Sequence, residues 1–408
     1  MNYAESVRFL YSLGNEVQTA KLGLDRIERL LGALGNPERG CRWVHVAGTN
    51  GKGSTSAMIE AGLRRAGLRT GLYTSPHLVE PVERIQVSGE PVSHALFAAT
   101  FSEVHDVAER MLESGDLELH PTYFETVTAM AFLFFARSNL DIGVLEVGLG
   151  GRLDATNVVT PALCVITPIA MDHEIFLGDS IPKIAREKAG ILKPGVPAVF
   201  AEQKPEAERL LMEHAAGPVT FSRDWPISHL QVEARGSRFR LRDIEIVCPL
   251  AGEHQVENAR TAAIALEQLG VSAAGIADTR WPGRLELVSE QPEIILDGAH
   301  NIAGTYALAR YIRRFYDGRK IWIVYGVMRD KSVAEMAGLL FPLAARVILT
   351  RPDNSRALEP ERISAVPATV THNVAEAVAL SRQAPKDAVV FITGSLFVVG
   401  EARALLVQ

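Results

Sequence analysis

One glycine-rich stretch of the chain, Gly48–Ser54, has residue types and a spacing that suit the binding of an anion. It lies between Trp43–Val46, which has the apolar, β-branched character of a buried strand, and Ser56–Arg65, which has the pattern of a helix. Glycines at such a turn let backbone N–H groups approach a phosphate, and the start of the helix favours negative charge. Lys52 can neutralise the outer phosphates.

The stretch departs from the general P-loop pattern in two places. Val46 occupies the position of the first glycine, and Gly53 follows the lysine where Ser or Thr is usual. A glycine-rich structural turn is the alternative interpretation. Because three glycines, a lysine and two hydroxyls are concentrated between a strand and a helix, we predict nucleotide phosphate binding.

Glu146 is a candidate metal ligand, since it interrupts the apolar run from Ile142 to Val147. A buried carboxylate without a partner is costly, so it requires a cation or hydrogen-bond donors. At the carboxyl end of a strand that faces bound phosphates, Mg²⁺ would be a natural partner. A hydrogen-bonded structural glutamate is the alternative.

The loop after this strand, Gly148–Asp154, is rich in glycine but does not match the dinucleotide fingerprint. Leu153 occupies the position of the third glycine. We interpret the loop as a backbone segment close to a ligand, with Arg152 and Asp154 as polar contacts. A purely structural loop fits the residues equally well.

A helix predicted from Ile181 to Ile191 carries a lysine among isoleucines. Lys188 shares one stripe with Ile181, Ile184 and Ile191, so the pattern places it on the buried face. Burial lowers the pKa of an amine, and a neutral amine can react with CO2 to give a carbamate, which is an oxygen ligand for a metal. The periodicity by itself favours a lysine that extends its amine to solvent.

Three further polar clusters are ambiguous from the residues alone. His173 follows Asp172 just past a predicted strand, where it could be structural or a ligand. Asp297–Asn301 follows another strand, and its side chains could contact a nucleotide or cap the next helix. The segment Gly252–Gln255, followed by Asn258, leaves the same choice open.

Strands alternate with helical stretches through most of the chain, which predicts βαβ units and a doubly wound, mostly parallel sheet. In such sheets, ligands bind at the carboxyl ends of the strands, and the polar clusters described above follow predicted strands. Residues 218–250 change to short alternating runs, which predict a small antiparallel sheet. We therefore predict an α/β P-loop ATPase-like domain at 1–287 and a smaller Rossmann-like α/β domain at 288–408.

The bulk composition narrows the class of protein. The chain has 408 residues and a formal net charge of −6, which gives no basic field for nucleic acid. Three scattered cysteines, Cys41, Cys164 and Cys248, form neither a metal-ligand spacing nor a disulfide framework. We recognise no signal peptide and no apolar run of about 20 residues, so we expect a cytoplasmic enzyme without a membrane partner.

Taken together, these stretches resemble the folylpolyglutamate synthase / dihydrofolate synthase family of the Mur ligase superfamily. The matching motifs occur in the family's order and cover most of the chain. They are Gly48–Ser54, Thr74–Leu78, Thr122–Glu125, Leu145–Asn157, Asp172–His173, Glu187–Ile191, His254–Gln255 with Asn258, Trp281–Arg284 and Asp297–Asn301.

The resemblance implies an ATP-dependent amide ligase that joins L-glutamate to dihydropteroate, to reduced folates, or to both. The acceptor carboxylate would be activated as an acyl phosphate and then attacked by the glutamate amine. The resemblance also implies two Mg²⁺ sites, closure of the two domains around ATP, and a monomer.

The resemblance assigns roles to individual residues, with Lys52, His173 and Lys188 as the catalytic ones. The predicted ATP contacts are Asn50, Gly51, Lys52, Gly53, Ser54, Asn258, Arg284, Asp297 and His300. The predicted metal ligands are Ser75 and Glu146 for one Mg²⁺, and Glu146, His173 and carbamylated Lys188 for the other. The predicted pterin or dihydropteroate contacts are Leu22, Gly23, Leu24, Asp25, Thr122, Tyr123, Phe124, Glu125, Arg152, Leu153 and Asp154.

Two other functions compete with this one. A cell-wall Mur ligase acting on a UDP-sugar peptide would use the same chemistry, but Pro76–Leu78 and Tyr123–Glu125 favour a folate. A P-loop switch without ligase activity would need no second metal site, so Glu146, His173 and Lys188 disfavour it.

Overall fold

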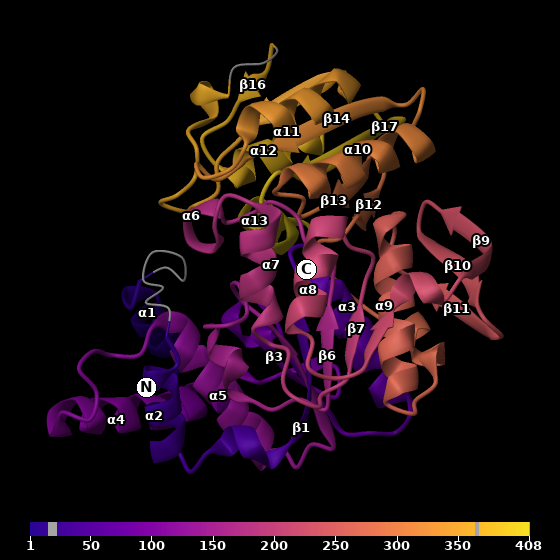
Figure 1. The fold of residues 1–408 in the computed structure, drawn as a ribbon. Coiled ribbons are helices and arrows are strands. Elements are labelled where there is room, and N and C mark those ends of the chain that lie inside the picture. The colour runs from indigo at the N-terminus through magenta and orange to yellow at the C-terminus, as the bar shows by residue number, and fades with distance from the viewer. Residues whose placement is uncertain (15–22, 364–366, 408) are drawn as a thin grey trace.

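Two mostly parallel β-sheets form the framework of the computed structural model, and the second follows the first along the chain. The structure describes residues 1–14, 23–363 and 367–407. The first sheet lies in the larger, lower part of the molecule in Figure 1, and the second lies in the orange and yellow part above it. This arrangement confirms the predicted fold class.

The larger sheet has eight strands in the order β4-β3-β2-β5-β1-β6-β7-β8. The six neighbouring strands β2, β5, β1, β6, β7 and β8 are parallel to one another. At one edge, β3 pairs antiparallel with β2, and β4 pairs antiparallel with β3. The strands are β1 (Arg42–Ala47), β2 (Thr70–Tyr73), β3 (Ile85–Val87), β4 (Glu90–Pro91), β5 (Ile142–Glu146), β6 (Leu163–Ile166), β7 (Ala198–Phe200) and β8 (Val219–Phe221).

Helices cover both faces of this sheet, which is why its central strands are buried throughout. Val44 and Val46 pack in the core that includes α3 and α9, while the neighbouring Trp43 packs with α5 on the other face. The helices are α1 (Tyr3–Ser12), α2 (Asp25–Ala33), α3 (Lys52–Arg65), α4 (His94–Ser114), α5 (Tyr123–Arg137), α6 (Glu174–Leu177), α7 (Ile181–Ala189), α8 (Pro205–His214) and α9 (His254–Gln268).

A small antiparallel sheet follows, made of β9 (Ile227–Glu233), β10 (Gly236–Leu241) and β11 (Ile244–Cys248). It confirms the sheet predicted within 218–250, with one correction at its start. Residues Val219–Phe221 instead form β8, which pairs in parallel with β7. Since α8 separates these two strands, they complete a βαβ unit of the larger sheet.

The second sheet has the order β12-β13-β17-β14-β15-β16 and is parallel except for the β12–β13 pair. Its strands are β12 (Glu286–Glu290), β13 (Glu293–Leu296), β14 (Lys320–Tyr325), β15 (Arg346–Leu349), β16 (Thr369–Val370) and β17 (Ala388–Thr393). Its helices are α10 (Ile302–Phe315), α11 (Val333–Leu340), α12 (Val374–Ser381) and α13 (Leu396–Leu406). Because β12 begins at Glu286, this sheet starts two residues before the predicted domain start at 288.

Short 3₁₀ helices occupy several connections: η1 (Pro37–Gly40), η2 (Pro81–Arg84), η3 (Ala155–Val158), η4 (Ser222–Asp224), η5 (Ala273–Asp278), η6 (Phe341–Leu343) and η7 (Pro360–Arg362). Among the described helices, none is both long and apolar enough to span a membrane. The parallel strands β1, β5 and β6 all have their carboxyl ends on the side of the larger sheet that faces the second domain. The polar clusters predicted from the sequence come together at these strand ends.

Candidate active site

A cavity of about 1060 Å³ lies between the two domains and receives side chains from both. The larger domain contributes the P-loop, Glu146 and Lys188, and the smaller domain contributes Asp297 and Lys331. The described lining includes most of the predicted site residues: Gly23, Asn50, Gly51, Lys52, Gly53, Ser54, Ser75, Thr122, Tyr123, Phe124, Glu125, Glu146, Leu153, Asp154, His173, Lys188, Asn258, Arg284, Asp297 and His300.

Four predicted residues do not appear in that lining. Leu24 and Asp25 lie at the start of α2, outside the cavity wall. Arg152 is exposed and pairs with Glu187 at 3.0 Å. Leu22 falls outside the described residues.

The P-loop turns sharply between β1 and α3. Gly51 has a φ of 84°, and a Cβ at this position would lie 2.3 Å from Oδ1 of Asn258. The N–H groups of Thr49 and Asn50 donate to the carbonyl of Pro168 at 3.0 and 3.2 Å, which fixes the loop against the segment after β6. Because α3 begins directly at Lys52, its free N–H groups and this ammonium lie at the cavity wall.

Helix α9 is connected to the P-loop by a short chain of hydrogen bonds. Asn258 donates from Nδ2 to Oε1 of Gln255 at 2.9 Å, and Gln255 donates from Nε2 to Oγ of Ser54 at 3.3 Å. The structure therefore brings Asn258, 204 positions after Ser54 in the sequence, next to the phosphate loop.

Glu146 ends β5 as a buried carboxylate. The backbone N–H of Ser75 donates to its Oε2 at 3.2 Å, and this is its one hydrogen bond among the described residues. Burial raises the pKa of Glu146, and the charge of Lys52 partly opposes that increase. The remaining lone pairs fit a hard cation such as Mg²⁺, and Ser75 lies beside them.

Lys188 lies on α7 with only 4% of its surface exposed, and Ile181, Ile184 and Ile191 are buried with it. The prediction that this stripe faces the interior is confirmed. Burial lowers the pKa of Lys188 to about 7, and repulsion from Lys52 acts in the same direction. A large share of the amine is therefore neutral near neutral pH.

The glycine loop after β5 packs directly on α7. A Cβ on Gly151 would lie 2.8 Å from the carbonyl of Glu187, and Arg152 donates its N–H to that same carbonyl at 2.7 Å. Asp154 accepts from the backbone N–H of Leu149 at 2.8 Å. This loop thus has a structural function, and it brings the buried amine of Lys188 to the cavity.

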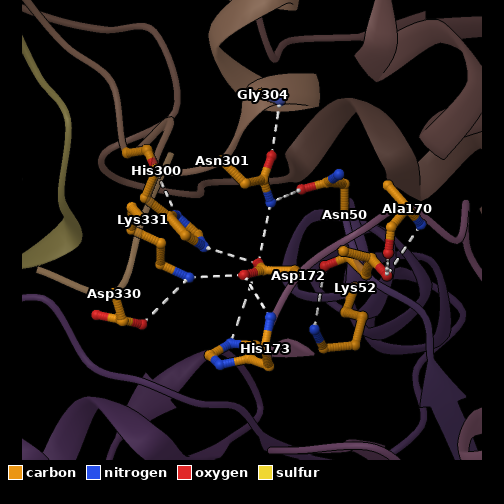
Figure 2. Close-up of polar contacts among 12 residues, drawn as sticks. Asn50, Lys52, Ala170, Asp172, His173, His300, Asn301, Gly304, Asp330 and Lys331 are labelled. Carbon is orange, nitrogen blue, oxygen red and sulfur yellow. Dashed lines mark hydrogen bonds and ion pairs between the residues drawn. The ribbon is translucent and has the colours of Figure 1, made fainter. Parts of the chain in front are cut away.

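A cluster of polar residues surrounds Asp172 at the boundary between the domains (Figure 2). Lys331 places its Nζ 2.6 Å from Oδ1, and Asn301 donates from Nδ2 to Oδ2 at 3.1 Å. His300 and His173 place their Nε2 atoms at 3.7 and 4.0 Å from Oδ2. Burial alone would raise the pKa of Asp172, but the neighbouring His173, His300 and Lys331 lower it below its ordinary value.

Asn301 connects the two domains. Its Oδ1 accepts from the N–H of Gly304 at 2.9 Å and so caps α10, as one of the two sequence interpretations predicted. Its Nδ2 donates at 2.9 Å to Oδ1 of Asn50, a residue of the P-loop (Figure 2). The side chain therefore serves as a helix cap and as a domain contact at once.

His173 precedes α6 with a φ of 51°. Burial lowers its pKa to about 4, although Asp172 opposes this shift. The imidazole is therefore neutral near pH 7, which is the form that can ligate a metal.

Arg284 and Asp297 form the wall of the cavity near the domain junction. Asp297 accepts from the N–H groups of Leu285 and Ala299 at 3.1 and 3.0 Å. Burial raises the pKa of Asp297 to about 6, and Arg284 opposes the shift. The pair presents one cation and one acceptor at the cavity wall.

The far end of the cavity is built around the start of α5. Thr122 and Glu125 form a capping box, and Arg26 pairs with Glu125 at 2.8 Å. Glu125 is therefore already occupied by protein partners, whereas Tyr123 and Phe124 supply aromatic surface to the cavity.

Several lining residues were missed as site residues from the sequence. Arg84 donates from Nε to Nδ1 of His77 at 2.8 Å, and Nε2 of His77 lies 3.2 Å from the hydroxyl of Tyr11. His77 lies in a motif that was recognised, so its position after a strand was a usable signal. Lys331 has no local pattern that predicts its position.

The fold and this site define a two-domain protein of the P-loop class whose nucleotide-type loop faces a cavity closed by a second α/β domain. Residues 46–266 match the Mur ligase middle domain, and residues 283–396 match the Mur ligase, glutamate ligase domain. The chain belongs to the Mur ligase superfamily and, within it, to the folylpolyglutamate synthase / dihydrofolate synthase family.

Three known proteins illustrate the similarity. The dihydrofolate synthase/folylpolyglutamate synthase of Bacillus subtilis is 39% identical over 359 residues, which cover 83% of each chain. The Mycobacterium tuberculosis folylpolyglutamate synthase complexed with ADP and AMPPCP has a TM-score of 0.90 and 32% identity, covering 100% of this chain and 99% of its own. Escherichia coli FolC in complex with DHPP and ADP has a TM-score of 0.87 and 30% identity, covering 99% and 97%.

Proposed function

We propose that this protein is an ATP-dependent amide ligase that adds L-glutamate to dihydropteroate, to the glutamate tail of reduced folates, or to both. The observation that carries the proposal is the convergence of Lys52, Glu146 and Lys188 on one interdomain cavity. A cation, a buried carboxylate and a lysine of lowered pKa suit the transfer of a phosphoryl group to a carboxylate.

The relatives support both halves of this proposal. The Bacillus subtilis relative carries both activities in its name, and the Mycobacterium tuberculosis structure contains ADP and AMPPCP. The Escherichia coli structure contains DHPP with ADP. We infer that this chain binds ATP and a folate-type acceptor in the same way.

We infer that the P-loop, from Asn50 to Ser54, binds the ATP phosphates. Lys52 would neutralise charge that develops on the transferring oxygens, and Arg284 would do the same from the domain junction. Asn258, Asp297 and His300 would complete the nucleotide contacts. Acyl phosphate formation converts a carboxylate oxygen, which is a poor leaving group, into phosphate, and the glutamate amine then displaces that phosphate.

The donor set fits two Mg²⁺ ions. Glu146 with Ser75 would hold one, and Glu146, His173 and a carbamate on Lys188 would hold the other. Bound Mg²⁺ supplies Lewis-acid stabilisation of phosphate charge. The lowered pKa of Lys188 supports the carbamate, because only a neutral amine reacts with CO2.

We further propose that the acceptor occupies the end of the cavity lined by Tyr123, Phe124 and Leu153. Residues 288–408 would form the glutamate ligase domain and 1–287 the ATP- and folate-binding domain. A monomer in the cytoplasm is the expected working form, and the elution volume on size-exclusion chromatography tests the monomer.

Product mass tests the proposal directly. The protein is incubated with ATP, Mg²⁺ and L-glutamate, with dihydropteroate in one reaction and tetrahydrofolate in another. We expect a gain of one glutamate on at least one acceptor, and a gain on both would establish a bifunctional enzyme. The variant Lys52→Ala serves as the inactive control.

Release of ADP is measured in the same reactions. A ligase releases ADP only when acceptor and amino acid are both present. ADP release without any glutamate gain on either acceptor would contradict the proposal and would favour a different Mur ligase substrate or a switch.

A further inference from the structure

A second group of possible metal ligands lies in the larger domain, away from the interdomain cavity. His105 and Glu109 lie one turn apart on α4, and His120 lies in the segment between α4 and α5. The ligand atoms of these three residues, the α4 histidine cluster, all lie within 4.8 Å of one another. None of the three belongs to the described lining of the cavity.

The hydrogen bonding of His120 fixes its tautomer. Its Nδ1 lies 2.8 Å from the carbonyl oxygen of Pro121, which can only accept, so Nδ1 carries the proton. In the neutral ring Nε2 therefore has a free lone pair. A histidine that donates one N–H to a backbone carbonyl and presents the other nitrogen is the usual arrangement of a metal ligand.

Two buried nitrogens of the cluster have no hydrogen-bond partner in the described parts of the chain. They are Nε2 of His120 and Nδ1 of His105. Buried polar atoms are normally satisfied, so an unsatisfied pair that converges on one point requires an explanation. A shared cation would satisfy both.

The distances also suit a shared cation. Oε1 of Glu109 lies 3.7 Å from Nδ1 of His105 and 3.6 Å from Nε2 of His120. These separations are too long for good hydrogen bonds. They are close to the separation of about 3.4 Å between two ligands that each lie about 2.0–2.1 Å from a tetrahedral Zn²⁺.

Aromatic rings restrain both imidazoles. Phe9 packs edge-on against His105 with 4.5 Å between ring centroids and lies 5.5 Å from His120. Phe101 stacks on His105 at 5.6 Å. Rings that are held in this way keep a ligand geometry without bound metal.

We propose that His105, Glu109 and His120 form a binding site for a first-row divalent transition metal, with Zn²⁺ as the expected occupant. Two imidazoles and one carboxylate are ligands that suit Zn²⁺ better than Mg²⁺. The two histidine side chains are 13% and 17% exposed, while that of Glu109 is 46% exposed, so water can supply the fourth ligand. The proposal does not depend on the proposed ligase function.

Metal binding at this site has a structural consequence. The ion links α4 to the segment that leads into α5, because His120 stands two residues before Thr122, the N-cap of α5. The same helix start supplies Tyr123 and Phe124 to the cavity. Bound Zn²⁺ thus stabilises the element that borders the far end of the cavity.

Zinc binding to the full-length protein tests the proposal. The protein is stripped with a chelator, saturated with Mg²⁺ to occupy the cavity sites, and titrated with ZnCl2 by isothermal calorimetry and by metal analysis after gel filtration. We expect wild type to retain one Zn²⁺ more than His105→Gln or His120→Gln. Glu109→Gln should weaken this site at least about tenfold.

A matched control comes from the same helix. His94 pairs with Glu80 at 2.7 Å and is exposed, and within the described part of the chain this pair belongs to no group of three possible metal ligands. The variant His94→Gln should retain the wild-type zinc content. Thermal unfolding gives a second measurement, since Zn²⁺ should raise the Tm of wild type and of His94→Gln by more than it raises the Tm of Glu109→Gln.

Equal zinc content and equal Tm shifts in wild type and Glu109→Gln would overturn the proposal and leave only a histidine–glutamate ion pair. Because Glu109 is almost half exposed, its substitution removes a ligand without opening the core. This variant therefore decides the question even if a histidine variant does not fold.

Discussion

At the scale of single residues, burial determines which protonation state each functional group adopts. Lys188 is buried and His173 is half-buried, and the pKa of each is lowered, to about 7 and about 4. Burial raises the pKa of Glu146 by the same loss of hydration. A cation placed among these groups would be bound by a carboxylate and by neutral nitrogen or carbamate ligands, which are suitable donors.

The first prediction concerns Lys188. Loss of an outer-shell partner of a metal ligand costs about 10–100-fold in activity, so loss of a ligand itself should cost more. We expect Lys188→Ala to lower kcat/KM by at least about 100-fold. Steady-state assays with and without added bicarbonate measure the effect.

The control for this experiment is Lys183→Ala, which removes an exposed lysine of the same helix that pairs with Asp179. It should keep activity within about twofold of wild type, because exposed ion pairs contribute little. Full activity of Lys188→Ala, together with turnover of wild type that does not respond to bicarbonate, would refute the carbamate.

The second prediction concerns His45, which lies on β1 directly before the P-loop. The hydroxyl of Thr156 donates to Asp154 and lies 2.8 Å from Nε2 of His45, so this nitrogen carries the proton. Burial lowers the pKa of His45 to about 3. Below pH 6.5 the unfolded chain therefore binds a proton that the folded protein does not, and stability decreases as pH falls towards 3.

We expect the free energy of unfolding of wild type to fall more steeply than that of His45→Gln across this range. The difference in slope should approach about 1.4 kcal/mol per pH unit, since one proton is involved. Urea unfolding of both proteins at pH values between about 6.5 and 4 measures it. Parallel stability curves would show that His45 does not contribute.

At the scale of single elements, the start of α3 depends on a backbone conformation that only glycine adopts easily. Gly51 has a positive φ and contacts α9 through Asn258. Gly67, after the end of the same helix, has a nearly identical φ of 86°, but no described atom lies within 4 Å of the place that a Cβ would occupy. Substitution of Gly67 therefore introduces backbone strain alone, whereas substitution of Gly51 introduces the same strain together with a steric clash.

The third prediction uses this pair. Gly51→Ala should weaken ATP binding at least about tenfold, because the methyl group displaces Asn258 and distorts the phosphate loop. Gly67→Ala should leave the affinity unchanged and lower stability by about 1 kcal/mol. Calorimetric titration with ATP and Mg²⁺ distinguishes them, and wild-type affinity in Gly51→Ala would argue against phosphate binding at this loop.

At the scale of the whole molecule, the two domains meet through a buried ion pair. Lys331 and Asp172 have side chains that are 9% and 7% exposed, and they come from different domains. Removing one partner of a buried pair leaves the other charge unpaired, which costs about 3–5 kcal/mol. The contact across the cavity therefore depends on this pair and on Asn301.

The fourth prediction follows from that contact. We expect Lys331→Met to lower kcat/KM at least about tenfold and to increase the radius of gyration measured with bound ATP, because the domains separate more easily. The control is Lys320→Met, which breaks an exposed pair between the start of β14 and Asp387 in the same domain. It should act within about twofold of wild type. Wild-type kinetics in Lys331→Met would show that the pair is dispensable.

The helix and strand pattern could be predicted from sequence because it depends on local periodicity and on glycine conformation. The strand–glycine loop–helix unit at Gly48–Ser54 and the buried stripe of α7 both follow from residues close in the sequence. The position of β8 could not be predicted, since a three-residue strand such as Val219–Phe221 is defined by its partner β7.

The sequence by itself determined the fold class, the P-loop and the carboxylate at the end of β5, because each can be recognised from residue patterns that are local in the sequence. Only the tertiary structure decided that Lys188 is enclosed and not extended to solvent, since the glycine loop after β5 covers α7. It also decided that Lys331 meets Asp172 across 159 positions. No local pattern encodes that contact, because it arises from the packing of one complete domain against another.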